Sequence, residues 1–360
     1  MAEGPSTDSG LRLAQDGARQ SPRHRTGLLV KAGLLALTIV LSLVLPWWLG
    51  GTGTLGAVMA FPPETLCLMV ALAILCWNLN AARLRLMLNG RAGRLGQTGA
   101  LAIEMSSKFA LCATPAGGGG VATLLWLLSR RGYPAAQGSA IFLVDQLADM
   151  LFFSLMLGLL VSLSLGGVAS WPHQSLVEAA LIGLMVALAA FTAIIVWLPR
   201  WLRYPPRLSV ITAWWPARLS PTPRARRWVV RRLLRCRHTL MNTLQLPPPI
   251  LAGIFLLCSL HWLARYSLLY LAVLGVGGQA DWAWTFLVQM LAMAASQLSV
   301  LPGGAGAAEV SVGALLLPVM AREQAAAAVI IWRLVSYHLY LVAGAPVFAV
   351  QLSSVWKRRR

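Results

Sequence analysis

The sequence contains few charged residues and no clustered cysteines. Only 11% of its 360 residues are charged, whereas an average soluble domain has about 25%. Because 58% of the residues are hydrophobic, the composition excludes an ordinary soluble domain. The five cysteines are scattered without a close pair, which argues against a disulfide framework or a metal site. We therefore expect no metal and no cofactor.

Acidic residues are also scarce, with 11 against 30 basic ones, so the formal net charge is +19. This excess does not predict nucleic-acid binding, because the basic residues lie between apolar runs. There they indicate loops whose positive charge sets the orientation of membrane spans. The expected partners are membrane lipids, with no nucleic acid.

Six apolar segments are long enough to cross a bilayer, which requires about 20 residues. They are 27–49, 61–81, 137–165, 175–198, 249–276 and 324–351. The sequence therefore predicts an all-α polytopic membrane protein whose transmembrane domain covers 27–352. Residues 1–26 are polar and are expected to be a disordered cytoplasmic segment without a cleaved signal, and 353–360 form a basic cytoplasmic tail.

Two further apolar regions are interrupted by proline and glycine. Residues 98–129 contain "TPAGGGG" and residues 283–319 contain "LPGGAG". The halves on either side are about 12 to 18 residues long, which is short for a span but suits a re-entrant helix. We predict two re-entrant helical hairpins in addition to the six full spans.

Positive charge in the loops predicts the topology. The stretches 82–97 and 199–248 are rich in arginine, whereas 50–62, 166–174 and 277–283 contain no lysine or arginine. With both termini in the cytoplasm and each hairpin returning to its side of entry, the basic loops fall inside, and Arg322 is the exception. We expect a bacterial cytoplasmic (inner) membrane protein whose loop 199–248 is a topology anchor or a lipid-binding surface.

The two interrupted regions resemble each other. Gln146 lies 31 residues after Pro115, and Arg333 lies 31 residues after Pro302. Gln146 and Arg333 both lie within predicted spanning segments. Three crossings separate the hairpins, so they enter from opposite sides, as in the inverted repeats of transporters. Chance similarity between two glycine-rich turns is the alternative.

Ionisable side chains inside a bilayer cost roughly 2.5–3.5 kcal/mol each, so each one is a candidate functional residue. The principal candidates are Glu104, Lys108, Asp145, Asp149, Glu309 and Arg333. The weaker candidates are His261, Arg265, Gln297 and His338.

The first four principal candidates form two pairs, each with helical spacing. Glu104 and Lys108 are four residues apart and are expected to form an ion pair, either structural or ligand-binding. Asp145 and Asp149 also share a helix face and would hold protons or a cationic group. The alternative for the two aspartates is a structural pair with Lys108 or Arg333.

The second hairpin and the last span supply the other candidates. Arg333 is the first choice for a contact with a lipid phosphate, and Tyr337 lies one turn further on the same face. Glu309 lies near the start of the helix that follows the glycines. The free backbone amides at this helix start can hold an anion such as a phosphate. The alternative is that Glu309 itself caps the helix. The turn before this helix consists of Pro302, Gly303, Gly304, Ala305 and Gly306.

The sequence "LPGGAGAAEVSVGALL" and the later "IIWRLVSYHLYLVAG" resemble the lysylphosphatidylglycerol synthase transmembrane-region family, whose members are flippase-like integral membrane proteins. Pro302, Glu309, Arg333 and Gly344 match its late motif in order, with the glycines between. The first half departs from the family pattern. Family members often carry Gly-Glu and a following Arg after the early proline, where this chain has Gly119, Gly120 and Thr123. They also tend to carry Glu-Arg before the later Asp, where this chain has Asp145 and Gln146.

The resemblance implies a lipid translocase without the soluble synthase domain of the lysylphosphatidylglycerol enzymes. A separate partner enzyme would then supply the lipid, and the expected ligand is an anionic phospholipid. Whether the chain forms a homo-oligomer is left open. In this interpretation Asp145, Asp149, Glu309 and Arg333 should converge on one polar cavity at the midplane. The alternatives are an intramembrane lipid-phosphate enzyme and a membrane scaffold or regulator, and we expect a transporter rather than an enzyme.

Overall fold

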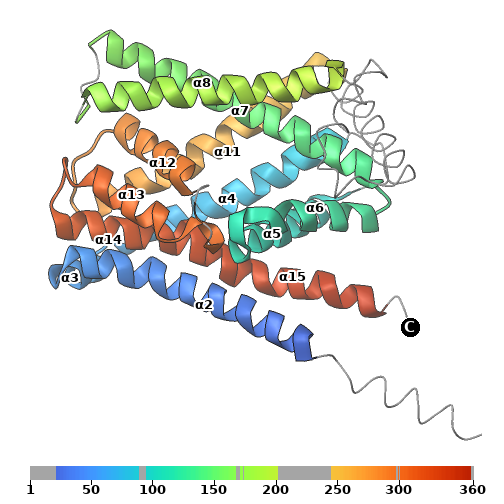
Figure 1. Cartoon of the computed structure of the whole chain (residues 1–360), viewed down its shortest axis with the longest axis horizontal. Coiled ribbons are helices and arrows are strands. Elements are labelled where there is room, and N and C mark those ends of the chain that lie inside the picture. Colours follow the sequence, from blue (N-terminus) through green and yellow to red (C-terminus); the bar gives the residue numbers. More distant parts are fainter. Residues whose placement is uncertain are drawn as a thin grey trace, which may run out of the picture.

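The computed structural model describes residues 22–88, 95–167, 171–172, 174–201, 245–296, 299 and 301–357. Every regular element in these ranges is a helix (Figure 1). The candidate Gln297, most of the arginine-rich loop and the last three residues of the tail lie outside the described residues.

Six continuous apolar helices are long enough to cross a bilayer, which confirms the predicted all-α polytopic class. Five of them are α2 (Pro22–Gly50), α4 (Pro63–Leu88), α7 (Ala135–Leu165), α8 (Gln174–Trp201) and α11 (Pro248–Gly275). The sixth is built from α14 (Arg322–Arg333), a π-helical turn η4 (Leu334–His338) and α15 (Leu339–Lys357). A short helix, α3 (Gly53–Met59), follows α2.

Helices α2 and α4 extend by several residues beyond their predicted limits. Helix α2 begins at Pro22, within the segment that was expected to be disordered. Helix α4 continues to Leu88, although its predicted span ends at 81. The added turns carry Arg83 into the packed interior, where it is 4% exposed. The residue that sequence analysis placed in a basic loop is therefore part of the core.

Both interrupted regions form helical hairpins, as predicted. The first consists of α5 (Gln97–Ala113), the turn η1 (Pro115–Gly117) and α6 (Gly118–Arg130). The second consists of α12 (Trp282–Ser296), the turn η3 (Pro302–Gly304) and α13 (Ala307–Leu316). In each hairpin the two arms pack against each other. None of these arms is long enough to cross a bilayer alone.

The hairpins enter the bundle from opposite ends and their tips meet inside it. Figure 1 shows α5 and α6 reaching inward from the end at which α2 begins and α15 finishes, and α12 and α13 reaching inward from the other end. The turns η1 and η3 are in contact, and η3 also touches α5. This is the opposed arrangement expected of an inverted repeat.

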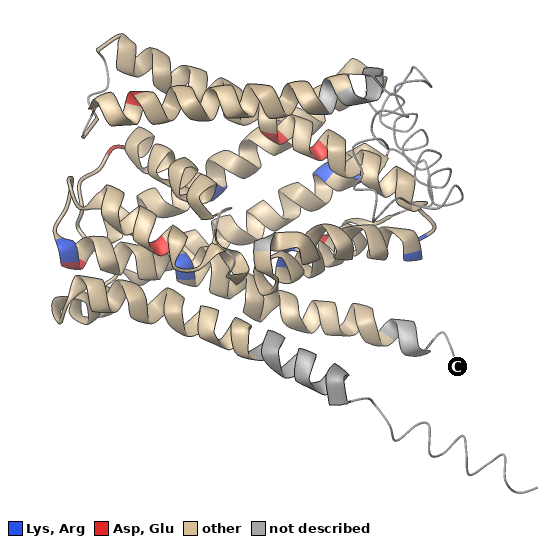
Figure 2. Cartoon of the chain, in the orientation of Figure 1, with Lys and Arg blue, Asp and Glu red and all other residues tan. Residues whose placement is uncertain are grey.

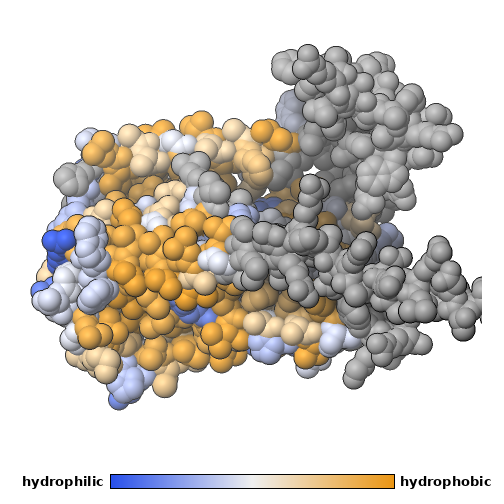
Figure 3. Space-filling view, turned by 60° about the horizontal axis from the view of Figure 1, so that its bottom comes forward, coloured by the Kyte–Doolittle hydropathy of each residue, from blue (hydrophilic) through white to orange (hydrophobic). Residues whose placement is uncertain are grey.

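The outer surface is apolar over the middle of the bundle. In Figure 3 hydrophobic residues cover the central part of the visible face, and hydrophilic residues gather at one end. Figure 2 shows charged residues both at the ends of the bundle and within it. Because charges inside a membrane protein are costly, these interior charges define the candidate site.

The last span is not a regular α-helix throughout. Its π-helical turn begins directly after Arg333, and the Leu339 amide bonds to the Leu334 carbonyl five residues earlier. Such π-bulges occur frequently at functional sites, because they shift the direction of neighbouring side chains. Here the turn contains Tyr337 and His338.

Candidate functional site

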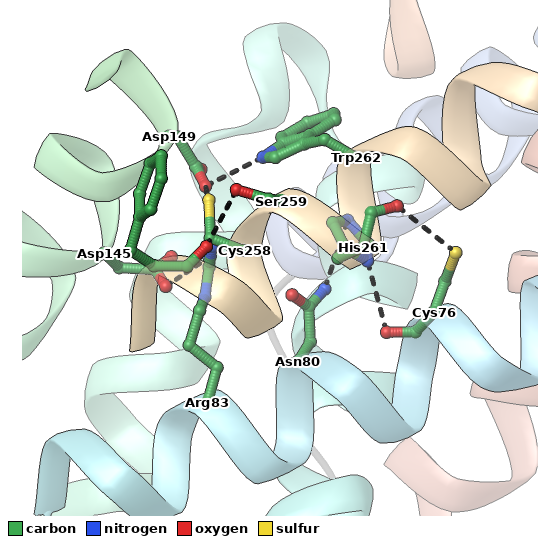
Figure 4. Close-up of polar contacts among 10 residues, drawn as sticks. Cys76, Asn80, Arg83, Asp145, Asp149, Cys258, Ser259, His261 and Trp262 are labelled. Atoms are coloured by element: carbon green, nitrogen blue, oxygen red, sulfur yellow. Dashed lines mark hydrogen bonds and ion pairs between the residues drawn. The ribbon is translucent and has the colours of Figure 1, made fainter. Parts of the chain in front are cut away.

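The first charge cluster joins Arg83 of α4 to two aspartates of α7 (Figure 4). The Arg83 Nη1 atom lies 2.7 Å from Asp149 Oδ1, and Nη2 forms an ion pair with Asp145 Oδ1. The alternative of a structural pair with Lys108 or Arg333 is therefore wrong, because Arg83 is the partner of both aspartates. The reason is the longer α4, which brings a nearer cation to the same face of α7.

Helix α11 adds two further donors to Asp149. The thiol of Cys258 donates to Asp149 Oδ1 at 3.2 Å, and the indole Nε1 of Trp262 donates to the same oxygen at 2.8 Å. The cluster thus contains two carboxylates and one guanidinium group, so it has an excess of negative charge. It suits a cationic group better than an anionic one.

The second charge cluster joins Arg333 of α14 to Glu309 of α13. Arg333 Nε lies 2.7 Å from Glu309 Oε1, and the two residues are 5% and 2% exposed. Nη1 also donates to the Gly303 carbonyl at 3.4 Å. Arg333, the first choice for a lipid phosphate, is therefore paired with Glu309, and its contact with a phosphate stays a prediction. The Glu309 carboxylate of α13 thus forms an ion pair with a residue of a different helix, α14.

The turn of the second hairpin depends on its glycines. Gly303, Gly304 and Gly306 all have positive φ, which L side chains rarely adopt. A Cβ atom on Gly303 would also overlap the ring of Tyr337. Pro302 is buried at the start of this turn. The predicted turn residues therefore shape the tip and let the last span approach it closely.

Tyr337 connects the two tips. Its ring lies beside Gly303 of the second hairpin, and its hydroxyl donates to the Cys112 carbonyl of the first hairpin at 3.3 Å. The guanidinium group of Arg333 lies 5.5 Å from the centre of the same ring. Tyr337 is 2% exposed, so these contacts are sealed within the core.

The two histidine candidates have structural partners. The His261 Nδ1 atom lies 3.2 Å from the Cys76 carbonyl, and Nε2 lies 3.5 Å from the amide nitrogen of Asn80 (Figure 4). His338 Nδ1 lies 3.1 Å from the Arg333 carbonyl, and Nε2 lies 3.1 Å from the Ser42 hydroxyl. Both rings therefore tie helices together.

The predicted ion pair between Glu104 and Lys108 is wrong. Within the described residues these side chains form no ion pair within 4 Å. Both are half-buried on α5, which packs against α4, α6 and α15. One-turn spacing permits a pair but does not decide where each side chain points, and the charges of both residues act on Asp145 of α7.

Two cavities adjoin the charge clusters. One of about 470 Å³ is bordered by Gln146 and Asp149, with aromatic rings including Trp262 and Tyr266. The other, of about 370 Å³, is bordered by Glu309 and lies among residues of α2, α13 and α14. The expected convergence of the acids and Arg333 on one cavity is therefore wrong. The clusters lie on different helices, so their cavities are separate.

Known proteins with a similar sequence identify the family. Residues 34–344 match the family described as the lysylphosphatidylglycerol synthase TM region. The chain belongs to this family. It is also similar to a UPF0104 membrane protein of Archaeoglobus fulgidus, with 25% identity over 290 residues, which is 78% of this chain and 85% of that protein. Together with the six apolar helices, the match establishes a multi-pass membrane protein of this family.

Within this family member, sequence analysis missed Arg83 as an interior residue. Arg83 lies seven residues after Cys76 and three after Asn80, so all three share a face of α4. A polar side chain at each of these positions is the pattern that could have extended the predicted span. The charge of Arg83 was instead attributed to topology, because it lies near other arginines.

Proposed function

We propose that this chain is a lipid translocase that moves a phospholipid or a lipid-linked head group between the two leaflets. The observation that carries the proposal is the meeting of two opposed helical hairpins inside the bundle. Transporters place their substrate sites where broken helices meet near the bilayer midplane, because backbone groups there remain free to bind polar ligands.

The two charge clusters support this proposal. Burying an ion pair costs desolvation energy that apolar side chains would not incur, so such pairs are poor devices for stability alone. Arg83 with its two aspartates, and Arg333 with Glu309, provide polar groups at a depth where a lipid head group would have to pass. A head group that replaces one partner of a pair lowers the cost of its own crossing.

In this proposal, the cavity beside Asp149 is the entry for a head group with a positive charge. Three donors engage one oxygen of Asp149, and Gln146 and four aromatic rings border the same cavity. Lysylphosphatidylglycerol, after which the family is named, carries amino groups that a carboxylate and aromatic faces can bind. We assign the Arg83 cluster the role of contacting the cationic part of such a head group.

We also propose transport rather than catalysis, with a separate enzyme supplying the lipid. The turns 114–120 and 301–306 contain no serine, histidine or arginine that could act on a phosphate. We place both ends of the chain in the cytoplasm of a bacterial inner membrane. The start of α2 and the end of α15 lie at the same end of the bundle, where α6 also ends at Arg130 and is followed by Arg131 (Figure 1).

Reconstitution tests the proposal. Purified protein in liposomes should equalise a fluorescently labelled phospholipid between leaflets, measured by the fraction that an external reductant can bleach. The change Asp149→Asn, which leaves Arg83 paired with Asp145, should slow this exchange while the protein stays folded. Asp281→Asn is the matched control, because Asp281 is an exposed carboxylate between helices. Wild-type protein that leaves the labelled lipid on its original side would refute the proposed function.

A further inference from the structure

The ring of His338, in the π-helical turn η4, has an oxygen atom beside each of its nitrogens. Nδ1 lies 3.1 Å from the carbonyl oxygen of Arg333, five residues earlier, and Nε2 lies 3.1 Å from the Ser42 hydroxyl oxygen of α2. The Ile39 backbone of α2 is a further hydrogen-bond partner of the ring. The imidazole therefore bridges the first and the last spans of the bundle.

The Arg333 carbonyl determines which ring nitrogen of His338 titrates. A carbonyl oxygen can only accept a hydrogen bond, so Nδ1 carries a hydrogen in every state that keeps this contact. Nε2 is then the ring atom that gains or loses a proton. In the neutral ring Nε2 has a lone pair and accepts, whereas in the charged ring it carries a second hydrogen and donates.

The Ser42 hydroxyl suits both states of Nε2. Ser42 is 0% exposed, so its one hydroxyl hydrogen has to go to a protein group. The hydroxyl oxygen lies 2.9 Å from the Ile39 carbonyl and 3.1 Å from His338 Nε2. Directed at Nε2, the hydrogen satisfies the neutral ring; directed at the Ile39 carbonyl, it leaves an oxygen lone pair for the charged ring. Rotation of one hydroxyl group therefore accommodates a proton without moving the ring.

His261, also inside the bundle, has partners that suit only the neutral ring. Its Nδ1 lies 3.2 Å from the Cys76 carbonyl, so Nδ1 carries the hydrogen. Its Nε2 lies 3.5 Å from the amide nitrogen of Asn80, which has hydrogens to donate and no lone pair to accept. The charges that act on this ring, from α4, α5 and α11, are all positive. The two histidines therefore differ in the group opposite Nε2.

The charged groups that act on His338 belong to one ion pair. Arg333 and Glu309 are these groups, and they lie 2.7 Å apart. The neighbouring Tyr337 ring is neutral and packs edge-on against the imidazole, with ring centres 5.2 Å apart. A proton on His338 therefore adds a net positive charge beside an ion pair that is itself neutral.

The other helices around this turn bring no carboxylate to it. Helix α2 has no charged residue in 33–50, and α15 has none before Lys357. Helix α11 directs Arg265 to the Ser336 carbonyl of the turn, and α4 directs Arg83 to the two aspartates of α7. Within the described residues, the charge of a protonated His338 is thus balanced by no partner other than Glu309, which Arg333 shares.

Imidazole is the side chain whose charge changes near neutral pH, and ionisable residues inside membrane proteins mark ion and proton pathways. We propose that His338 is a proton-binding site that makes lipid transport depend on pH. The ring takes up a proton at Nε2, and the added charge beside Arg333 favours the passage of an anionic phosphate group. The coupling rests on the proposed lipid transport, whereas the proton site itself does not.

Nuclear magnetic resonance of the full chain with isotope-labelled histidine tests the proton site, because each ring nitrogen reports whether it carries a hydrogen. The chain has five histidines, so the signals of His338 and His261 are identified by their loss in His338→Gln and His261→Gln. As the pH falls from about 8 to about 5, Nε2 of His338 should gain a hydrogen while Nδ1 keeps its own. Nε2 of His261 should stay without hydrogen and is the internal control. A His338 ring that keeps a single hydrogen throughout, or whose Nδ1 lacks one at high pH, would overturn the site.

Lipid exchange in liposomes tests the coupling. Between about pH 7.5 and about pH 5.5 the protonated fraction of a free imidazole grows about tenfold, so exchange of labelled phosphatidylglycerol by wild-type protein should rise severalfold. This rise should be lost in His338→Gln and should persist in His261→Gln. If His338→Gln does not fold, His338→Asn replaces it, since the amide of asparagine also donates hydrogen bonds. A rise that survives the loss of the His338 imidazole would overturn the coupling.

The two measurements separate this inference from the proposed function. Wild-type protein whose His338 gains a proton at Nε2, but which moves no lipid at low or high pH, would refute the transport and support the proton site. Protein that moves lipid equally fast at both pH values, with a His338 that never gains a second hydrogen, would overturn the proton site and support the transport.

Discussion

The hydroxyl group of Tyr337 donates a hydrogen bond of 3.3 Å to the backbone carbonyl of Cys112. Cys112 lies at the end of α5, just before the tip of the first hairpin, and the ring of Tyr337 lies against Gly303 in the tip of the second. One side chain of the last span therefore contacts both hairpins where they meet. Because Tyr337 belongs to the π-helical turn, a change in that turn would alter its contacts with both hairpins.

The Tyr337 hydroxyl is expected to stabilise the junction of the tips. Tyr337→Phe keeps the ring beside Gly303 and removes one buried hydrogen bond, which should lower the free energy of unfolding by about 1 kcal/mol. Unfolding in mixed micelles followed by circular dichroism measures this change. The control is Tyr270→Phe, since Tyr270 is half-buried and makes no side-chain hydrogen bond within the described residues. An equal loss in both variants would remove the hydrogen bond as the cause.

Gly303 should not tolerate a side chain. Its φ of +62° is unfavourable for alanine, and a Cβ would overlap the Tyr337 ring. Gly303→Ala should therefore destabilise the protein by roughly 1–3 kcal/mol and slow lipid exchange. The matched control is Gly313→Ala in α13, where a Cβ meets nothing within 4 Å and where alanine favours a helix. Thermal unfolding in detergent compares the two, and similar behaviour would contradict the role of the tight turn.

Sequence reasoning found the breaks but not the partners of the charged residues. The six spans and both hairpins follow from apolar length and from Pro302, Pro115 and their glycines, which are local features. Arg83 was misplaced because an arginine at the end of an apolar run is equally compatible with a basic loop. Lys108 was paired with Glu104 from one-turn spacing, whereas packing against other helices decides where each side chain points.

Arg83 is expected to be essential because it neutralises two buried carboxylates. Arg83→Gln leaves Asp145 and Asp149 without their cation, which should cost roughly 3–5 kcal/mol of stability. Adding Asp149→Asn should restore part of that loss by removing one of the uncompensated charges. Arg85→Gln is the control on the same helix, because Arg85 is exposed and its donors bond to the Leu95 carbonyl and to Gln97 at the start of α5. Unfolding of all four proteins in the same detergent provides the comparison.

A different result would reassign the cluster. If Arg83→Gln unfolds no more readily than Arg85→Gln, the carboxylates must be protonated or hydrated in the folded protein. If Asp149→Asn fails to restore any stability, Asp145 alone carries the interaction with Arg83. Either outcome would weaken the role proposed for this cluster in contacting a cationic head group.

The pair formed by Glu309 and Arg333 should behave as one unit. Each is nearly fully buried, so Glu309→Gln or Arg333→Gln alone leaves an uncompensated charge and should cost roughly 3–5 kcal/mol. The double variant removes both charges and should be less destabilised than the sum of the single ones, with a coupling of roughly 0.5–3 kcal/mol. Unfolding of the four proteins of this cycle, under one set of conditions, measures the coupling.

The same cycle separates structure from transport for this pair. Glu323→Gln, at an exposed position one residue after the start of α14, is the control for loss of a carboxylate and should be near neutral. If the pair only holds α13 to α14, the double variant should exchange lipid at a rate that follows its restored stability. If the pair opens to let a head group pass, lipid exchange should remain slow although the fold is restored. Additive losses of stability, with no coupling, would show that the 2.7 Å contact between Arg333 and Glu309 contributes nothing to the folded state.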